Sequence, residues 1–123
     1  MNAALWIVQI VLAMMMLMAG AMKVMKSKDE LHEKMGWVED FSENTIKAIG
    51  GLEVLGAIGL ILPAVTGIAP VLVPLAAVGL AITMVGAVAV HVRRSEMASV
   101  AITVMLLAMA VFVAWGRFGD YAF

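Results

Sequence analysis

The sequence predicts an all-α membrane protein, a four-helix bundle with a short amphipathic interfacial helix between its first and second spans. Hydrophobic residues make up 64% of the 123 residues, and only 14% are charged. The apolar residues fall into four runs, each near the roughly 20 residues that a helix needs to cross the hydrocarbon. A soluble domain of this length could not bury so much apolar surface, so we expect lipid to surround most of a single transmembrane domain, residues 1–123.

The four spans are expected at about residues 3–22, 45–62, 70–92 and 97–115. Helices are expected because a backbone in lipid must satisfy its own hydrogen bonds. Pro63 and Pro70 bracket the short link between the second and third spans. The first run is expected to be a retained span and not a cleaved signal peptide, because no Lys or Arg precedes it and Lys23 follows it.

The distribution of basic residues predicts the orientation. Four spans place both termini on one side of the membrane, and the connections at residues 23–44 and 93–96 on the other. Arg117 belongs to the side of the termini, and the remaining basic residues belong to the side of the connections: Lys23, Lys26, Lys28, Lys34, Lys47, Arg93 and Arg94. The positive-inside rule then predicts cytoplasmic connections and both termini outside the cytoplasm.

The first connection carries the pattern of a short helix. Ser27 and Glu30 have the spacing of a capping box. Leu31, Met35 and Val38 then fall on one side, which predicts an amphipathic helix lying on the membrane surface. Trp37 is expected nearby as an aromatic anchor at the inner interface, with Trp6, Trp115 and Tyr121 at the outer one.

Three ionisable residues lie near or within the apolar runs: Lys23, Glu53 and His91. A charged side chain at bilayer depth costs roughly 3 kcal/mol or more, so such residues usually face the bundle interior and mark function. All three fall in the half of the membrane nearest the connections. Each also lies on a face of small residues, which favours close helix packing. Those faces contain Gln9, Ala13, Met16 and Gly20 for Lys23, Gly50, Gly56 and Ala57 for Glu53, and Gly79, Thr83 and Ala87 for His91. The second span is expected to be the most buried.

Simpler roles remain open for each residue. Lys23 could be a boundary lysine whose stem reaches the interface, and His91 an interfacial histidine. Glu53 could form a structural pair with Lys23 or fix the helix register as a neutral acid.

The absence of cysteine excludes disulfides and thiolate chemistry, and the net charge of −1 gives no indication of nucleic-acid binding. No HxxxH or ExxH spacing suggests a metal site.

Several segments resemble the DoxX-like family of small four-helix membrane proteins. The firmest are MAGAMKVM at the end of the first span, IGGLEVLGAIGLILP in the second and AVHVRR at the end of the third. These segments contain Lys23, Glu53 and His91, which the resemblance implies as site residues. It also implies the inner (cell) membrane of a bacterium. Some relatives are subunits of quinone-linked redox complexes, and others resemble assembly chaperones.

Two classes of function follow. The first is a ligand- or quinone-binding subunit of a membrane redox complex, with Glu53, Lys23 and His91 lining a pocket for a quinone or another lipid-soluble molecule. The second is a non-catalytic assembly chaperone or structural partner, in which the same residues fix the bundle and a groove engages another membrane protein or a second copy. A transporter is a weaker third alternative, because four spans in one chain are few. No enzymatic activity is assigned.

Overall fold

Four long helices form the body of the protein in the computed structural model, which describes residues 1–33 and 35–123. They are α1 (Asn2–Met25), α3 (Glu43–Thr66), α4 (Leu72–Arg93) and α5 (Met97–Phe118). All four are long and apolar enough to cross a membrane. At 22–24 residues each is about 33–36 Å long, somewhat more than the hydrocarbon thickness. The structure has one helix at each of the four predicted spans, and each helix ends one to four residues beyond the predicted end.

The link between the second and third spans is shorter than the two prolines suggested. The helix α3 continues through Pro63 and ends at Thr66. Proline lacks one backbone donor but accepts normally, and the N–H of Gly67 donates to the Pro63 carbonyl at 3.0 Å. Gly67 has a φ of 72°, the left-handed conformation that commonly ends a helix. The turn therefore covers residues 67–71, and Pro70 lies within it.

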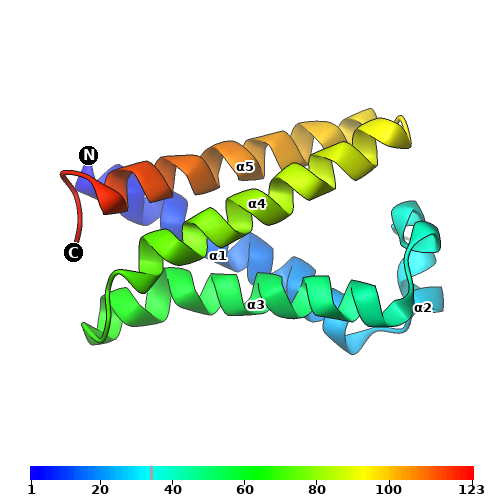
Figure 1. The fold of residues 1–123 in the computed structure, drawn as a ribbon, viewed down its shortest axis with the longest axis horizontal. Helices are drawn as coiled ribbons and strands as arrows, with labels where there is room; N and C mark the ends of the chain where they lie inside the picture. The colour runs from blue at the N-terminus through cyan, green and yellow to red at the C-terminus, as the bar shows by residue number, and fades with distance from the viewer. Residues whose placement is uncertain (34) are drawn as a thin grey trace.

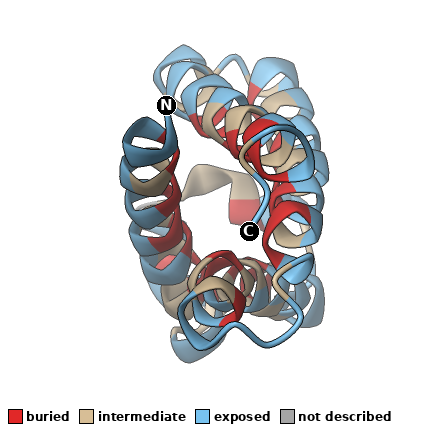
Figure 2. Ribbon diagram, turned by 90° about the vertical axis from the view of Figure 1, so that its left-hand side faces the viewer, coloured by how far each residue is buried: buried red, intermediate tan, exposed pale blue. Residues whose placement is uncertain are grey.

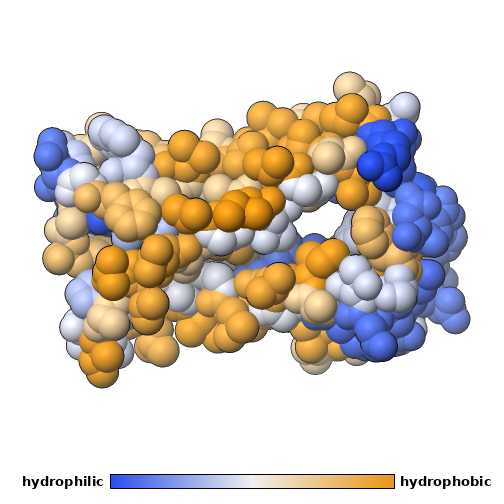
Figure 3. All heavy atoms as spheres, in the orientation of Figure 1, coloured by the Kyte–Doolittle hydropathy of each residue, from blue (hydrophilic) through white to orange (hydrophobic). Residues whose placement is uncertain are grey.

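The helices associate as two antiparallel pairs (Figure 1). α1 packs along α3, and α4 packs along α5. The pairs meet through α3 with α4 and through α1 with α5. Both termini lie at one end, and the connection that contains α2 lies at the other, as the span count predicted. An apolar surface covers the length of the helices, while hydrophilic side chains gather most densely at the connection end (Figure 3). Lys34, assigned above to the connection side, lies outside the described residues.

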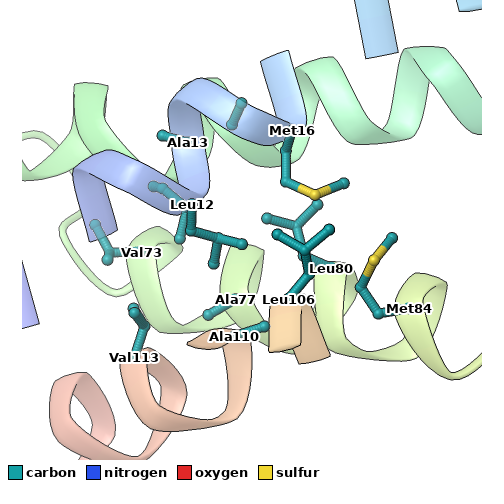
Figure 4. Close-up of a cluster of buried hydrophobic side chains, with 12 residues drawn as sticks. Leu12, Ala13, Met16, Val73, Ala77, Leu80, Met84, Leu106, Ala110 and Val113 are labelled. Carbon is teal, nitrogen blue, oxygen red and sulfur yellow. The ribbon is translucent and has the colours of Figure 1, made fainter. Parts of the chain in front are cut away.

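The buried residues face the inside of the four-helix arrangement (Figure 2). The main core contains residues from all four long helices (Figure 4): Leu12, Ala13, Met16, Ala57, Leu60, Val73, Ala77, Leu80, Met84, Leu106, Ala110 and Val113. The expectation that the second span is the most buried is wrong. In the most apolar stretch of each helix, 33% of residues are buried in α1 and 22% in α3. The buried residues of α1 run along its whole length, from Leu5 to Lys23.

Within its described residues, the first connection contains the expected short helix together with a second short element. α2 covers Lys28–His32, and the 3-10 helix η1 covers Gly36–Asp40. The capping box is present, because the Ser27 hydroxyl accepts from the Glu30 N–H and the Glu30 carboxylate accepts from the Ser27 N–H. The apolar side chains turn toward the protein, where Leu31 and Val38 are buried against Ile46 of α3. The connection is therefore part of the fold.

Candidate functional site: a polar cavity at the connection end

Two glycines bring α1 and α3 into close contact. A Cβ atom added at Gly20 would lie 2.6 Å from the carbonyl oxygen of Gly50, and one at Gly50 would lie 2.6 Å from Cβ of Lys23. Any larger residue would push the helices apart. Each glycine stands three residues before a charged residue, in Gly20-x-x-Lys23 and Gly50-x-x-Glu53. Side chains lean toward the N-terminus of their own helix, so in an antiparallel pair these two lean toward each other.

The result is a buried ion pair inside the bundle. Lys23 Nζ donates to Glu53 Oε1 at 2.5 Å, and both residues are buried. The pair is net neutral, which lowers the cost of holding either charge away from water. Glu53 is the only acceptor that Lys23 Nζ contacts among the described residues. The ammonium group therefore keeps N–H donors for a ligand.

The third predicted residue lies on the same cavity but in a different hydrogen bond. His91 is buried at the end of α4, and its Nδ1 lies 2.9 Å from Oε1 of Glu96. An ionised carboxylate can only accept, so Nδ1 carries the hydrogen and Nε2 has no partner among the described residues. The pairing with Glu96 holds the pKa of that carboxyl below its usual range. Nothing in the sequence pattern pointed to Glu96, which lies in the loop after α4.

The small-residue face proposed for α4 is partly wrong. Gly79 is exposed, and a Cβ atom there would meet nothing within 4 Å. A strict spacing of four residues rotates by about 40° at each step around a helix of 3.6 residues per turn, so Gly79 has turned away from the face of His91. Leu80 and Met84 occupy the inner face of α4. Thr83 and Thr103 donate to carbonyls of their own helices.

Trp37 covers the polar residues from the connection. Its ring lies 5.5 Å from Lys23 Nζ, and its centroid lies 6.5 Å from that of the His91 ring. Phe41 packs edge-on against it at 5.6 Å. One side chain of η1 thus contacts residues from both helix pairs. Sequence reasoning placed Trp37 at the membrane interface as an anchor and did not include it in the site.

Arg94 holds η1 in this position. Its Nη1 lies 2.8 Å from Glu39 and 2.9 Å from Asp40, and its Nε lies 3.4 Å from Glu96. The hydrogen bond from His32 and the one from Arg94 hold the pKa of Glu39 below its usual range. These contacts join the first connection to the loop between α4 and α5.

A cavity of about 510 Å³ lies beneath Trp37, between the two helix pairs. Lys23, Glu53 and His91 all line it, so the structure brings the three predicted site residues to one space. Its other polar lining comes from Glu96, Ser99, Thr83 and Thr103, and its apolar walls come from all four long helices: Met16, Ala19, Ile49, Leu52, Ile82, Met84, Gly86, Ala87, Val90, Ile102 and Leu106. Figure 3 shows an opening between the two pairs next to the hydrophilic end.

A second polar cluster lies at the end with the termini, and sequence reasoning missed it. Gln9 is fully buried; its Nε2 donates to the Leu60 carbonyl, and its Oε1 accepts from Nε of Arg117 at 3.0 Å. Arg117 is itself 2% exposed. The sequence feature that could have revealed this cluster is Gln9, an amide on the buried face of the first span, opposite the end of the last span.

Among residues 1–33 and 35–123, no group of three or more His, Cys, Asp or Glu side chains is placed to hold a metal ion.

Comparison with known proteins identifies the family. The model of the DoxX-like family matches residues 7–113, most of the chain. The chain belongs to the DoxX-like family. Searches of curated proteins and of solved structures found no match. The part of this DoxX-like protein that matches includes Lys23, Glu53 and His91, whereas Arg117 and the C-terminal tail follow it.

Proposed function

We propose that this DoxX-like membrane protein binds a lipid-soluble molecule with a small polar head group, such as a quinone, in the cavity beneath Trp37. The observation that carries the proposal is the convergence of Lys23, Glu53 and His91 on one cavity between the helix pairs. Its volume is within the range of about 300–1,000 Å³ that is typical of small-molecule sites.

The chemistry of the lining supports a neutral amphiphile. The Lys23–Glu53 pair balances its own charge, so no net charge is left for an ionic head group to neutralise. Lys23 can donate to a carbonyl oxygen, and Nε2 of a neutral His91 ring can accept a hydrogen bond. Apolar walls surround these groups and suit a ring or an isoprenoid chain. A molecule dissolved in the bilayer can enter through the lateral opening without crossing water. In a redox complex this subunit would hold the quinone for a partner that carries the electrons.

A fluorescence titration tests the proposal. Decylubiquinone is added to the purified protein in nonionic detergent, with Trp6 and Trp115 replaced by phenylalanine so that Trp37 is the remaining tryptophan. We expect saturable quenching. Glu53→Gln keeps the shape of the side chain and removes its charge, so Lys23 loses the charged partner that fixes its ammonium group in the cavity. Binding should weaken by about tenfold or more, since a hydrogen bond to a charged group contributes about 1.5–3 kcal/mol.

The matched control is Glu43→Gln, which changes an exposed acid at the start of the same helix. It should bind like the parent. Quenching that does not saturate, or that is equal in the Glu53→Gln and Glu43→Gln proteins, would show that the cavity does not select the quinone.

A role as a structural or assembly partner is the second candidate, and the exposed glycines of α4 favour it. Gly79 and Gly86 are both exposed, and an added Cβ would meet nothing within 4 Å at either position. Membrane helices commonly associate through such small residues. Gly79→Leu, which lies away from the cavity lining, should release a copurifying membrane protein or a second copy if this role holds. The role as a partner would be excluded by two results together: copurification unchanged in Gly79→Leu, and quinone binding lost in Glu53→Gln.

We further propose that the connection end faces the cytoplasm and that both termini lie outside, in the inner membrane of a bacterium. Lys26, Lys28, Arg93 and Arg94 all lie at the connection end, whereas Arg117 lies at the end with the termini. This distribution is the one that the positive-inside rule associates with a cytoplasmic location.

A further inference from the structure

Arg117 is held at the end of α5 by neutral groups in the part of the chain that the structure describes. Nε donates to Gln9 Oε1, and Nη1 donates to Asn2 Oδ1 at 2.6 Å and to the Tyr121 carbonyl at 2.9 Å. No carboxylate lies within 4 Å of the guanidinium among the described residues. The cavity lysine and Arg94 differ in this respect, because each contacts at least one carboxylate. Within residues 1–33 and 35–123, Arg117 is thus a buried cation without a counterion.

The guanidinium also has an unused donor group. Nη2 is buried and makes no hydrogen bond within the described part of the chain. A buried polar group without a partner is strongly unfavourable, and more so when it is charged. The two remaining N–H bonds on Nη2 are therefore available to an acceptor that the chain itself does not supply.

Aromatic rings cover the cation. The ring centroid of Phe123 lies 4.1 Å from Cζ of Arg117, and that of Trp6 lies 5.5 Å away. Trp6 and Phe123 pack edge-on at 5.4 Å. Trp6 is fixed within α1, but Phe123 belongs to the short segment after α5, whose backbone forms turns and no continued helix. Removing the Phe123 ring would open one side of the guanidinium without disturbing the bundle.

We propose that Arg117 binds a phosphate oxyanion at the termini end of the bundle, supplied by the head group of a phospholipid. A planar guanidinium donates through paired N–H groups to phosphate oxygens, and Nη2 provides two such donors. Binding supplies the missing counterion and satisfies the orphaned donor group at once. Phe123 lies over the guanidinium and has to move aside for the phosphate to bind. This site is at the opposite end from the quinone cavity and independent of it.

Lipid binding by delipidated protein tests the proposal. Native mass spectrometry counts phosphatidylglycerol molecules retained by the parent protein, by Arg117→Gln and by the control Arg93→Gln, which removes an exposed cation at the other end. We expect one tightly held lipid in the parent and in Arg93→Gln, and affinity about tenfold or more lower in Arg117→Gln, as expected for loss of a charged hydrogen-bond donor. Equal retention by all three would overturn the proposal.

A second variant keeps the test decisive if Arg117→Gln does not fold. Phe123→Ala leaves the guanidinium and its partners Gln9 and Asn2 in place, and should raise the affinity for phosphatidylglycerol. Unchanged or weaker binding would contradict the proposal. Competition with inorganic phosphate distinguishes the two sources of the oxyanion. Displacement of the lipid at millimolar phosphate would assign the site to free phosphate and refute the phospholipid assignment, whereas retention supports the lipid.

Discussion

At the scale of single residues, the pair formed by Lys23 and Glu53 answers how a carboxylate can lie within an apolar span. Glu53 is 2% exposed and contacts the ammonium group of Lys23 directly. Neither charge would be stable alone in that position, because an isolated buried ion keeps its full desolvation cost. The two residues are therefore expected to behave as one unit.

Lys23→Met should lower the free energy of unfolding by about 3–5 kcal/mol, because it leaves Glu53 without its partner. The double variant Lys23→Met, Glu53→Gln should be more stable than Lys23→Met alone, since the second change removes the unpaired charge. Denaturation in mixed detergent micelles measures both effects as a double-mutant cycle. Lys26→Met, which changes a lysine outside the cavity lining, is the control. Additive effects of the two changes would mean that the residues act separately.

At the scale of helices, the contact between α1 and α3 depends on two glycines that oppose each other. The carbonyl oxygen of Gly50 and the backbone of Gly20 lie so close that a side chain fits at neither position. The same approach places the lysine and the glutamate within reach of each other. Packing and site geometry are therefore set by the same residues.

Gly50→Ala should lower the free energy of unfolding by about 1–3 kcal/mol, the usual effect of overpacking a well-filled contact. Its Cβ would stand 2.6 Å from Cβ of Lys23 and 2.7 Å from the backbone oxygen of Gly20. The neighbouring Gly51 provides the matched control, because a Cβ atom there meets nothing within 4 Å. Gly51→Ala should be neutral or slightly stabilising, given the higher helix propensity of alanine. The measurement is the midpoint of thermal unfolding in detergent, and equal midpoints for the two variants would contradict the close approach.

At the scale of the whole molecule, hydropathy alone determines the four spans and their antiparallel order. The positions of Lys23, Glu53 and His91 could be inferred because charged residues in apolar helices turn inward, and a helical repeat carries that information along the sequence. The partners of these residues could not be inferred from the sequence in this way. Glu96 and Trp37 lie in connections without a repeating pattern, and their approach depends on how the two helix pairs are placed. Arg117 pairs with Gln9 across 108 positions of sequence, a contact that no local pattern encodes.

The orientation in the membrane is testable with this cysteine-free chain. Single cysteines replace Asp29, which is exposed at the connection end, and Ala122, which is exposed near the C-terminus. An impermeant maleimide applied to intact bacterial cells should label Ala122→Cys and leave Asp29→Cys unlabelled until the cells are opened. The reverse pattern would place the connections outside the cell.

The division into two helix pairs has a mechanical consequence. The pairs are joined near the 67–71 turn and by the contact of α1 with α5, whereas the cavity lies toward the opposite end. A rotation of one pair relative to the other about this junction therefore moves the helix ends beside the cavity most. With a lever arm of about 15 Å, the length of some ten helical residues, a relative rotation of about 5° changes the width of the opening by roughly 1 Å. Arg94, which joins η1 to the α4–α5 loop, connects the two pairs at their ends beside the cavity and so opposes their separation.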